Sequence, residues 1–177
     1  ILSFFGVATD QGTGSSAENF RIAYSYDGMH WSSLNGNEPV VKPTKGSTRR
    51  VRDPFIMRSK DGSFTLMATQ GWDTPYLYFW HSDRLTDFDN ERLLKATTAG
   101  AAQGLSGWRA WAPEGLYDPI TDLYYVYWSD PDAPAHATYY NSSADLESLS
   151  EPGILFQPGS RHLDANIIKY DGTYYLD

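Results

Sequence analysis

Three acidic residues stand at or near equivalent places in a pattern that recurs along the sequence. Asp53 and Asp164 each lie where a polar stretch gives way to a short apolar segment, and Glu114 lies two residues after Ala112, which occupies the third such place. Hydrolysis of a glycosidic bond needs a carboxylic acid that protonates the leaving oxygen and a carboxylate that activates water or attacks. Carboxylates that lie close together also raise the pKa of one of them, which separates the acid from the base. If the fold brings the three positions together, the chain holds the groups for this reaction.

Taken one at a time, each of these acids has an ordinary structural explanation. An aspartate before a proline, as Asp53 is before Pro54, often initiates a turn. Glu114 follows Pro113 and could be a solvated turn residue, and Asp164 could cap the start of a strand. Their shared position in the repeat favours the catalytic interpretation, so Asp53, Glu114 and Asp164 are the predicted catalytic residues.

Four residues near these acids are candidates for binding a substrate. Trp72 and Trp111 flank the predicted strand starts and could stack on a sugar ring, although core or loop packing fits their sequence equally well. Arg52 could donate hydrogen bonds to a carboxylate or a sugar hydroxyl, or could lie on the surface. His162 stands two residues before Asp164 and could face the same channel, although a lone histidine more often has a structural role.

The segments that must position these side chains are predicted to be β-strands. The apolar stretches are short, rich in aromatic and β-branched residues and bounded by turn residues, which is typical of strands. Asp61-Gly62 and Asp171-Gly172 each separate two such stretches, and this dipeptide is a strong signal for a β-hairpin. The sequence therefore predicts an all-β protein, with polar loops at 10–19 and 95–107.

Two kinds of segment alternate along the chain and repeat. The first kind has a polar start, an apolar strand, a turn and an aromatic strand, and the second is a shorter aromatic and polar stretch. Copies recur at intervals of roughly 50 to 60 residues, the length of a four-stranded propeller blade, and sandwiches rarely repeat their sequence in this way. The first kind occupies 53–69, 112–129 and 164–176, and the second occupies 23–31, 80–88 and 140–149.

The repeats predict a β-propeller of which this chain covers roughly three blades. We expect one partial domain over residues 1–177 because propellers typically have four to eight blades. The last strand would present an unpaired edge, which native proteins usually avoid. The remainder of the propeller, or another chain, is therefore expected to complete the fold. The predicted blade limits are 1–47, 48–106, 107–160 and an incomplete 161–177.

Composition narrows the range of partners. The formal net charge is −8, and the strongest basic cluster is Arg49-Arg50 with Arg52, so a nucleic-acid partner is not expected. No apolar run is long enough to span a membrane, so no membrane partner is expected either. With 15% aromatic residues, a carbohydrate substrate is the expected partner. We expect an extracellular or periplasmic location. Asn141-Ser142-Ser143 matches the N-glycosylation sequon, a match that is frequent by chance.

Several kinds of chemistry have no support in the sequence. Cysteine is absent, which excludes disulfides, a thiolate nucleophile and cysteine metal sites. The four histidines show no metal-ligand spacing, and neither a phosphate-binding glycine loop nor a Gly-x-Ser-x-Gly motif occurs. No cofactor and no metal site are predicted, although a structural cation would be compatible with the fold.

The motifs together resemble those of glycoside hydrolase family 43. Arg52-Asp53-Pro54, then Trp111-Ala112-Pro113-Glu114, then Leu163-Asp164-Ala165-Asn166 carry the resemblance, which extends over nearly the whole chain. It implies a five-bladed propeller and inverting acid–base hydrolysis of pentose-containing polysaccharides or oligosaccharides, as by arabinofuranosidases and xylosidases. It also implies that Asp53 is the general base and that Asp164 tunes the pKa of the acid and positions substrate. The family's general-acid glutamate normally lies beyond the second aspartate, and the sequence ends before such a motif.

Two alternatives remain open. Arg52-Asp53-Pro54 followed by a proline-associated glutamate also resembles the related glycoside hydrolase family 32 of fructan and sucrose hydrolases. On that interpretation Asp53 stabilises the transition state, Glu114 is the acid and the nucleophile lies upstream. The other alternative is a non-catalytic propeller that binds carbohydrate. We expect the isolated chain to lack a complete site and to be inactive alone.

Overall fold

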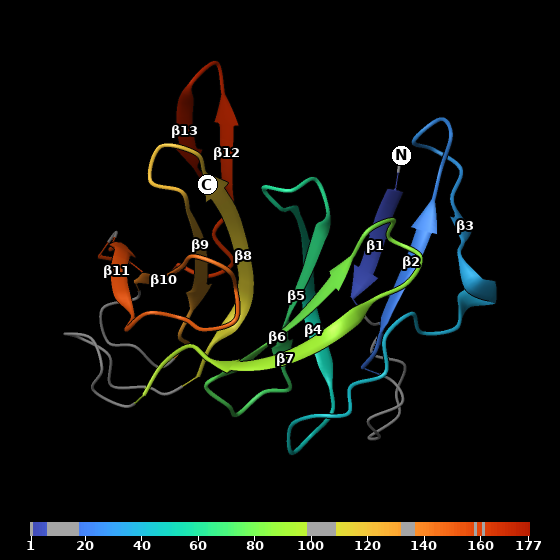
Figure 1. The fold of residues 1–177 in the computed structure, drawn as a ribbon, viewed down its shortest axis with the longest axis horizontal. Helices are drawn as coiled ribbons and strands as arrows, with labels where there is room; N and C mark the ends of the chain where they lie inside the picture. Colours follow the sequence, from blue (N-terminus) through green and yellow to red (C-terminus); the bar gives the residue numbers. More distant parts are fainter. Residues whose placement is uncertain (1, 7–17, 99–108, 132–136, 158, 161) are drawn as a thin grey trace.

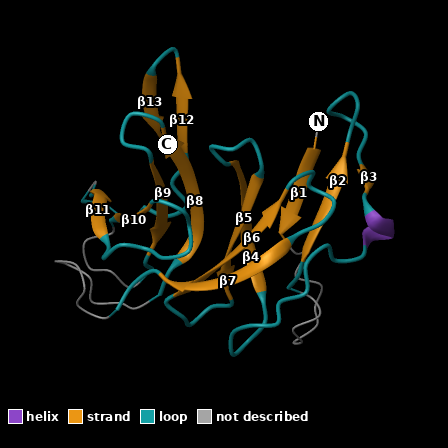
Figure 2. Cartoon of the chain, in the orientation of Figure 1, coloured by secondary structure: helices purple, strands orange, loops and turns teal. Residues whose placement is uncertain are grey.

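A computed structural model of the chain describes residues 2–6, 18–98, 109–131, 137–157, 159–160 and 162–177. Within these residues the chain is all-β, as predicted, and the one helical segment is a short 3₁₀ turn at Asn35–Asn37. The strands form antiparallel sheets in which consecutive strands are neighbours (Figures 1 and 2). None of the helical structure in the described part of the chain is long and apolar enough to cross a membrane.

Two of the sheets have four strands each and correspond to the two complete repeats in the sequence. They are flanked by a three-stranded sheet on the N-terminal side and a two-stranded sheet on the C-terminal side. The first sheet contains β1 (Leu2–Gly6), β2 (Phe20–Tyr24) and β3 (Ser32–Ser33). The second contains β4 (Val51–Arg58), β5 (Phe64–Gln70), β6 (Tyr76–Ser82) and β7 (Asp89–Lys95). The third contains β8 (Trp111–Asp118), β9 (Leu123–Ser129), β10 (Thr138–Ser143) and β11 (Gly153–Phe156), and the fourth contains β12 (Ile167–Tyr170) and β13 (Thr173–Leu176).

The predicted hairpins form at both Asp-Gly pairs. Asp171 and Gly172 join β12 to β13 with φ angles of 47° and 76°, so both turn residues adopt the left-handed conformation that a tight two-residue hairpin requires. The loop between β4 and β5 is longer. There, Asp61 accepts hydrogen bonds from the backbone and the hydroxyl of Ser63, and Gly62 has a φ of 89°.

The second sheet is buried on both faces. Successive residues of a strand point to opposite sides of the sheet, so Leu66 and Ala68 of β5 face the first sheet whereas Met67 faces the third. The neighbouring sheets are in close contact, because a Cβ added to Gly115 of β8 would lie only 2.8 Å from Met67 Cε. Fully or nearly fully buried aromatic side chains fill the two clusters: Phe20, Tyr78 and Trp80 in one, and Phe79, Trp128 and Tyr139 in the other.

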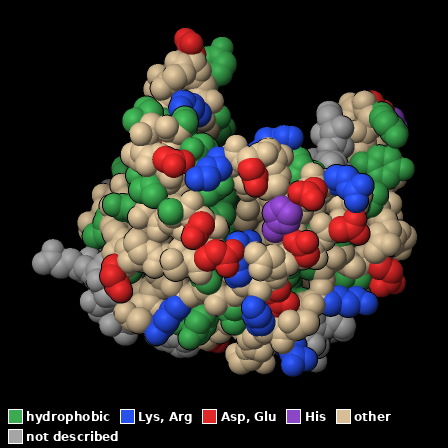
Figure 3. Space-filling view, viewed as in Figure 1, with side chains coloured by type: hydrophobic (Ala, Val, Ile, Leu, Met, Phe, Trp, Pro, Cys, Tyr) green, Lys and Arg blue, Asp and Glu red, His purple; other side chains and the backbone are tan. Residues whose placement is uncertain are grey.

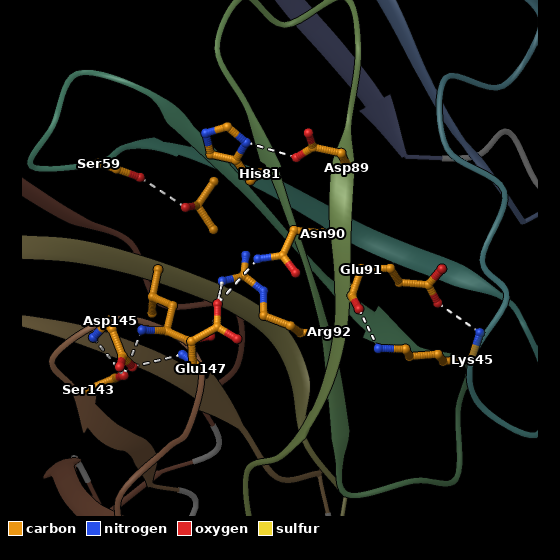
Figure 4. A network of polar contacts seen from close by, with 12 residues as sticks. Lys45, Ser59, His81, Asp89, Asn90, Glu91, Arg92, Ser143, Asp145 and Glu147 are labelled. Atoms are coloured by element: carbon orange, nitrogen blue, oxygen red, sulfur yellow. Dashed lines mark hydrogen bonds and ion pairs between the residues drawn. The ribbon is translucent and has the colours of Figure 1, made fainter.

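Polar contacts along β7 connect the second sheet to segments on either side of it (Figure 4). Glu91 accepts hydrogen bonds from the backbone N–H groups of Thr44 and Lys45, at 2.9 and 2.8 Å. Arg92 donates to Glu147 at 2.7 Å, which ties β7 to the connection that follows β10. Acidic and basic side chains are interspersed over the face shown in Figure 3.

Asn141 joins the second and third sheets from a fully buried position on β10. Its Nδ2 donates to the backbone oxygens of Ala96 and Ser150, at 2.9 and 2.8 Å, and its Oδ1 accepts from Trp128 Nε1 at 2.7 Å. An amide with these contacts is not accessible for glycosylation in the folded protein. The sequon match at Asn141 therefore marks a core residue.

Candidate active site

Three residues near the start of the first strand of successive sheets share an unusual backbone conformation, and they are called strand-start residues below. Asp53, Ala112 and Asp164 have φ angles of 46°, 46° and 59°, a region that residues with a Cβ rarely occupy. The strand pairing shifts register between Arg52 and Phe55 in β4, and in the same way between Trp111 and Glu114 in β8. A β-bulge of this kind bends the strand and re-aims a side chain. The repeat seen in the sequence is thus also a repeat of backbone geometry.

A buried hydroxyl in each complete sheet holds the strand start of the next sheet. Thr69 Oγ1 accepts the N–H of Ala112 at 2.8 Å, and Ser129 Oγ accepts the N–H of Asp164 at 3.1 Å. Thr69 and Ser129 occupy equivalent places, because each pairs with the residue just before a strand-start residue, Arg52 in one sheet and Trp111 in the other. These two hydrogen bonds connect each strand-start residue to the sheet before it and so constrain the distances between the strand-start residues.

Asp53, Glu114 and Asp164 line one cleft of about 240 Å³. Its walls come from β4 and β8, which pack against each other, and from the segment that precedes β12. The structure thus brings together the three acidic residues that the sequence singled out. The remaining described residues that line the cleft are Pro54, Phe55, Ala112 and Pro113.

The Asp53 carboxyl lies among charges of both signs. Its pKa is raised, first because the cleft walls remove part of its hydration and then because of the nearby charges of Asp164 and Glu18. The charge of Arg52 and a hydrogen bond from Thr69 act in the opposite direction. The side chain remains accessible from the cleft, so it can contact a substrate or a water molecule.

The Glu114 carboxyl is partly buried and hydrogen-bonded at one oxygen. Burial raises its pKa and the charge of Asp164 raises it further, whereas hydrogen bonds from Asn166 and Tyr127 lower it. Asn166 Nδ2 and Tyr127 Oη donate to Glu114 Oε2 at 2.7 and 3.0 Å. A carboxyl with a raised pKa beside a second carboxylate has the properties of a general acid.

Arg52, Trp72 and Trp111 form a cluster beside the cleft. The Arg52 guanidinium lies 3.5 Å from the centroid of the Trp72 ring and is 3.0 Å from Glu18 Oε1. Trp111 donates from Nε1 to the backbone oxygen of Trp72 at 2.7 Å, and the two rings meet edge to face at 5.3 Å. Trp72 is 42% exposed, so part of its ring is accessible to a ligand. Trp72, Trp111 and Arg52 are not among the described residues that line the cleft itself.

His162 is not among the described residues that line the cleft. Its ring packs edge-on against Phe156 at 5.8 Å, and its buried Nε2 has no hydrogen-bond partner within the described part of the chain. This packing is compatible with a structural role for His162, the alternative to a place in the channel.

Sequence reasoning missed Glu18, Tyr127 and Asn166. Glu18 lies in a predicted polar loop, and nothing in the sequence links it to Arg52, 34 residues later. Tyr127 belongs to a strand with several aromatic residues, and nothing in the sequence distinguishes it from the other tyrosines there. Asn166 could have been found from the repeat, because it occupies the place that Glu114 and Phe55 occupy in the other copies.

The described residues contain no group of three or more His, Asp or Glu side chains arranged to hold a metal ion.

Comparison with known proteins relates both the sequence and the fold to carbohydrate-active enzymes. A family model described as a probable glycosyl hydrolase domain, related to family 43, matches residues 3–176. No protein with a curated description matches the sequence. Among solved structures, an exo-1,5-alpha-L-arabinanase from a bovine ruminal metagenomic library has a TM-score of 0.65 at 14% identity. That match covers 93% of this chain and 60% of the arabinanase.

Two further structures have similar scores. An arabinoxylan arabinofuranohydrolase of family 43 from Bacillus subtilis has a TM-score of 0.62 at 14% identity, over 89% of this chain and 36% of that one. A family 32 beta-fructofuranosidase from Bombyx mori has a TM-score of 0.64 at 17% identity, over 99% of this chain and 38% of that one. The chain thus spans less than two thirds of each of these proteins. At such identities the likeness concerns the fold, and the predicted partial β-propeller is confirmed.

Proposed function

Because the chain belongs to the family 43-related family of probable glycosyl hydrolase domains, we propose that it supplies part of the active site of a glycosidase acting on pentose-containing polysaccharides or oligosaccharides. The observation that carries this proposal is the convergence of Asp53, Glu114 and Asp164 on one cleft. Hydrolysis of a glycosidic bond by paired carboxylates needs such a convergence.

Each carboxyl has a distinct role in the proposed reaction. Glu114 is the general acid, because burial and the charge of Asp164 raise its pKa and keep it protonated to higher pH. Asp53 is the general base, and Arg52 opposes the rise in its pKa. Asp164 tunes the pKa of the acid by its charge. The sequence left the acid open between Glu114 and a residue beyond Asp164, and the position of Glu114 in the cleft favours Glu114.

The choice of a pentose-containing substrate has separate support. The arabinanase and the arabinofuranohydrolase are named for arabinose-containing substrates, and they share this fold. The exposed part of the Trp72 ring, held by Arg52 and Trp111, gives an aromatic face on which a sugar can stack.

A second candidate is a fructan or sucrose hydrolase that retains anomeric configuration. The position of Glu114 in the same cleft as Asp53 favours it as well, because that class expects the acid at this position. The likeness to the beta-fructofuranosidase fold is consistent with it. In that case Asp53 stabilises the transition state.

A substrate panel assayed with the full-length protein separates these candidates. We expect release of pentose from arabinofuranosides or xylosides, with inversion at the anomeric carbon in proton NMR of the first product. Release of fructose from sucrose or fructans with retention would replace the first proposal with the second. Sugar binding measured by calorimetry without any hydrolysis would leave a non-catalytic propeller.

Two variants test the roles of the carboxyls. Asp53→Asn is expected to lower kcat about 10²- to 10⁴-fold on every substrate. Glu114→Gln should lower kcat similarly on natural saccharides but much less on a dinitrophenyl glycoside, because that leaving group departs without protonation. Asp87→Asn, whose side chain is 86% exposed, is the matched control and should retain full activity. Equal losses of Glu114→Gln on both kinds of substrate would contradict its role as the acid.

A further inference from the structure

We propose that Tyr127 and Asn166 are positioning residues that hold Oε2 of Glu114, so that Oε1 carries the proton delivered in the cleft. The inference rests on the proposed function in one respect, which is that Glu114 acts as the acid. It adds two residues and an atom-level assignment to that role.

The hydrogen bonds of Glu114 distinguish its two oxygens. Tyr127 Oη and Asn166 Nδ2 both donate to Oε2, at 3.0 and 2.7 Å. Among the residues that the structure describes, none donates to Oε1. A carboxyl oxygen has two in-plane lone pairs, and two donors occupy both of those on Oε2. When Glu114 is protonated, its proton must therefore sit on Oε1.

Tyr127 is fixed as a donor. Its side chain is buried, and its Oη accepts the backbone N–H of Ile167 at 3.1 Å, which turns the hydroxyl hydrogen towards Glu114. Burial raises the pKa of Tyr127, and the charge of Glu114 raises it further. Tyr127 thus keeps its proton throughout the pH range in which carboxyl groups work.

Asn166 is fixed through its backbone. Its N–H donates to the backbone oxygen of Asp177 at 3.0 Å, and its oxygen accepts the N–H of Asp177 at 2.9 Å, which extends the ladder between β12 and β13. The amide that reaches Glu114 is therefore positioned by the last hairpin, whereas Glu114 and Tyr127 belong to the third sheet. The orientation of the acid depends on contact between two neighbouring sheets.

The titratable groups around Glu114 set the direction of the expected pH effect. Asp53 from β4 and Asp164 from the segment before β12 line the cleft with it, and Tyr127 faces it from β9. The two donors stabilise the ionised form of Glu114 and lower its pKa. Removing either donor must raise that pKa. Because activity ends where the acid loses its proton, the alkaline limb of the pH profile then moves to higher pH.

The experiment measures kcat and kcat/KM against pH for Tyr127→Phe and Asn166→Asp in the full-length protein. Both substitutions nearly preserve the size of the side chain. We expect the alkaline limb to move to higher pH in each, and further in Asn166→Asp, because a second carboxylate would then oppose ionisation of Glu114. We also expect kcat to fall on the order of 10-fold or more, because the proton is no longer held in place. Tyr125→Phe, two residues away on the same strand, is the control and should leave the profile unchanged.

A second readout does not depend on activity. Infrared difference spectroscopy follows the carboxyl band of Glu114, identified by its loss in Glu114→Gln, and this band should titrate at higher pH in both variants. An unchanged titration and an unmoved alkaline limb would overturn the positioning roles while leaving Glu114 as the acid. Wild-type activity of Glu114→Gln on natural saccharides would instead overturn the proposed function.

Discussion

Arg52 is adjacent to Asp53 in the sequence, and its positive charge acts on Asp53. Arg52 also contacts Glu18 and Trp72. The guanidinium pairs with Glu18 at 3.0 Å and stacks on Trp72 at 3.5 Å. An arginine held on two sides has a fixed geometry, so its effect on Asp53 is also fixed. Charge distribution around the proposed base is therefore set by three residues that come from different segments of the chain.

The acidic limb of the pH profile should report this arrangement. Arg52 lowers the pKa of Asp53, so removing its charge in Arg52→Gln raises that pKa. Because the proposed base must be ionised, activity should begin only at a higher pH than in the wild type, which kcat/KM measured from pH 3 to 7 would show. Arg52→Lys keeps the charge and should shift the limb less. A limb that stays in place in Arg52→Gln would mean that Asp53 is not the titrating group.

At the level of strands, the residues with left-handed backbone at Ala112 and Asp164 depend on hydroxyl groups in the sheet before them. Ser129 is almost fully buried and accepts the N–H of Asp164. Without this acceptor a partly buried N–H group loses its partner, which costs about 1–3 kcal/mol. Ser129→Ala should lower the free energy of unfolding in urea by that amount. Ser33→Ala, at an exposed position of β3, should change it very little, and equal effects of the two would contradict the assigned role of Ser129.

Close approach of the second and third sheets depends on a glycine. A Cβ at position 115 would lie 2.8 Å from Met67 Cε and 3.0 Å from the backbone oxygen of Tyr125. Met67 can move but the backbone cannot move easily, so Gly115→Ala should destabilise the protein by about 1–3 kcal/mol. Thermal unfolding would measure this loss. Adding Met67→Leu, which shortens the closer side chain, should recover part of it, and no recovery would show that the contact with Tyr125 dominates.

Over the whole molecule, the repeat in the sequence predicted more of the fold than any single segment did. The two complete copies correspond to the two four-stranded sheets, because each copy carries its own turns and its own alternation of aromatic residues. The register within the strands was harder to predict. Pro54 and Pro113 mark the two bulges as irregular places, but a proline alone does not say which residues pair across the bulge. The burial of Asn141 could not be predicted from its sequon, because its amide contacts Ala96, which follows β7 and is 45 residues away in the sequence.

The acidic residues of the candidate site could be predicted from the sequence, but the hydrogen bonds that hold them could not. Asp53 and Asp164 follow from equivalence in the repeat, and Glu114 follows from its place two residues after their counterpart Ala112. The partners of Glu114 lie 13 and 52 residues away, and such pairings follow only from how the sheets pack against each other. Conversely, residues that are close in sequence need not share the site. His162 is only two residues from Asp164, yet it is not among the described residues that line the cleft.

Ala112 has the same left-handed backbone as Asp53 and Asp164 but has no carboxylate. For a residue with a Cβ this conformation costs roughly 1–2 kcal/mol, and alanine gains nothing from it through a functional group. The bent backbone therefore forms without a carboxylate, so the scaffold and the chemistry are separable. A strand-start position can thus carry an acid or lack one while the local backbone keeps the same conformation.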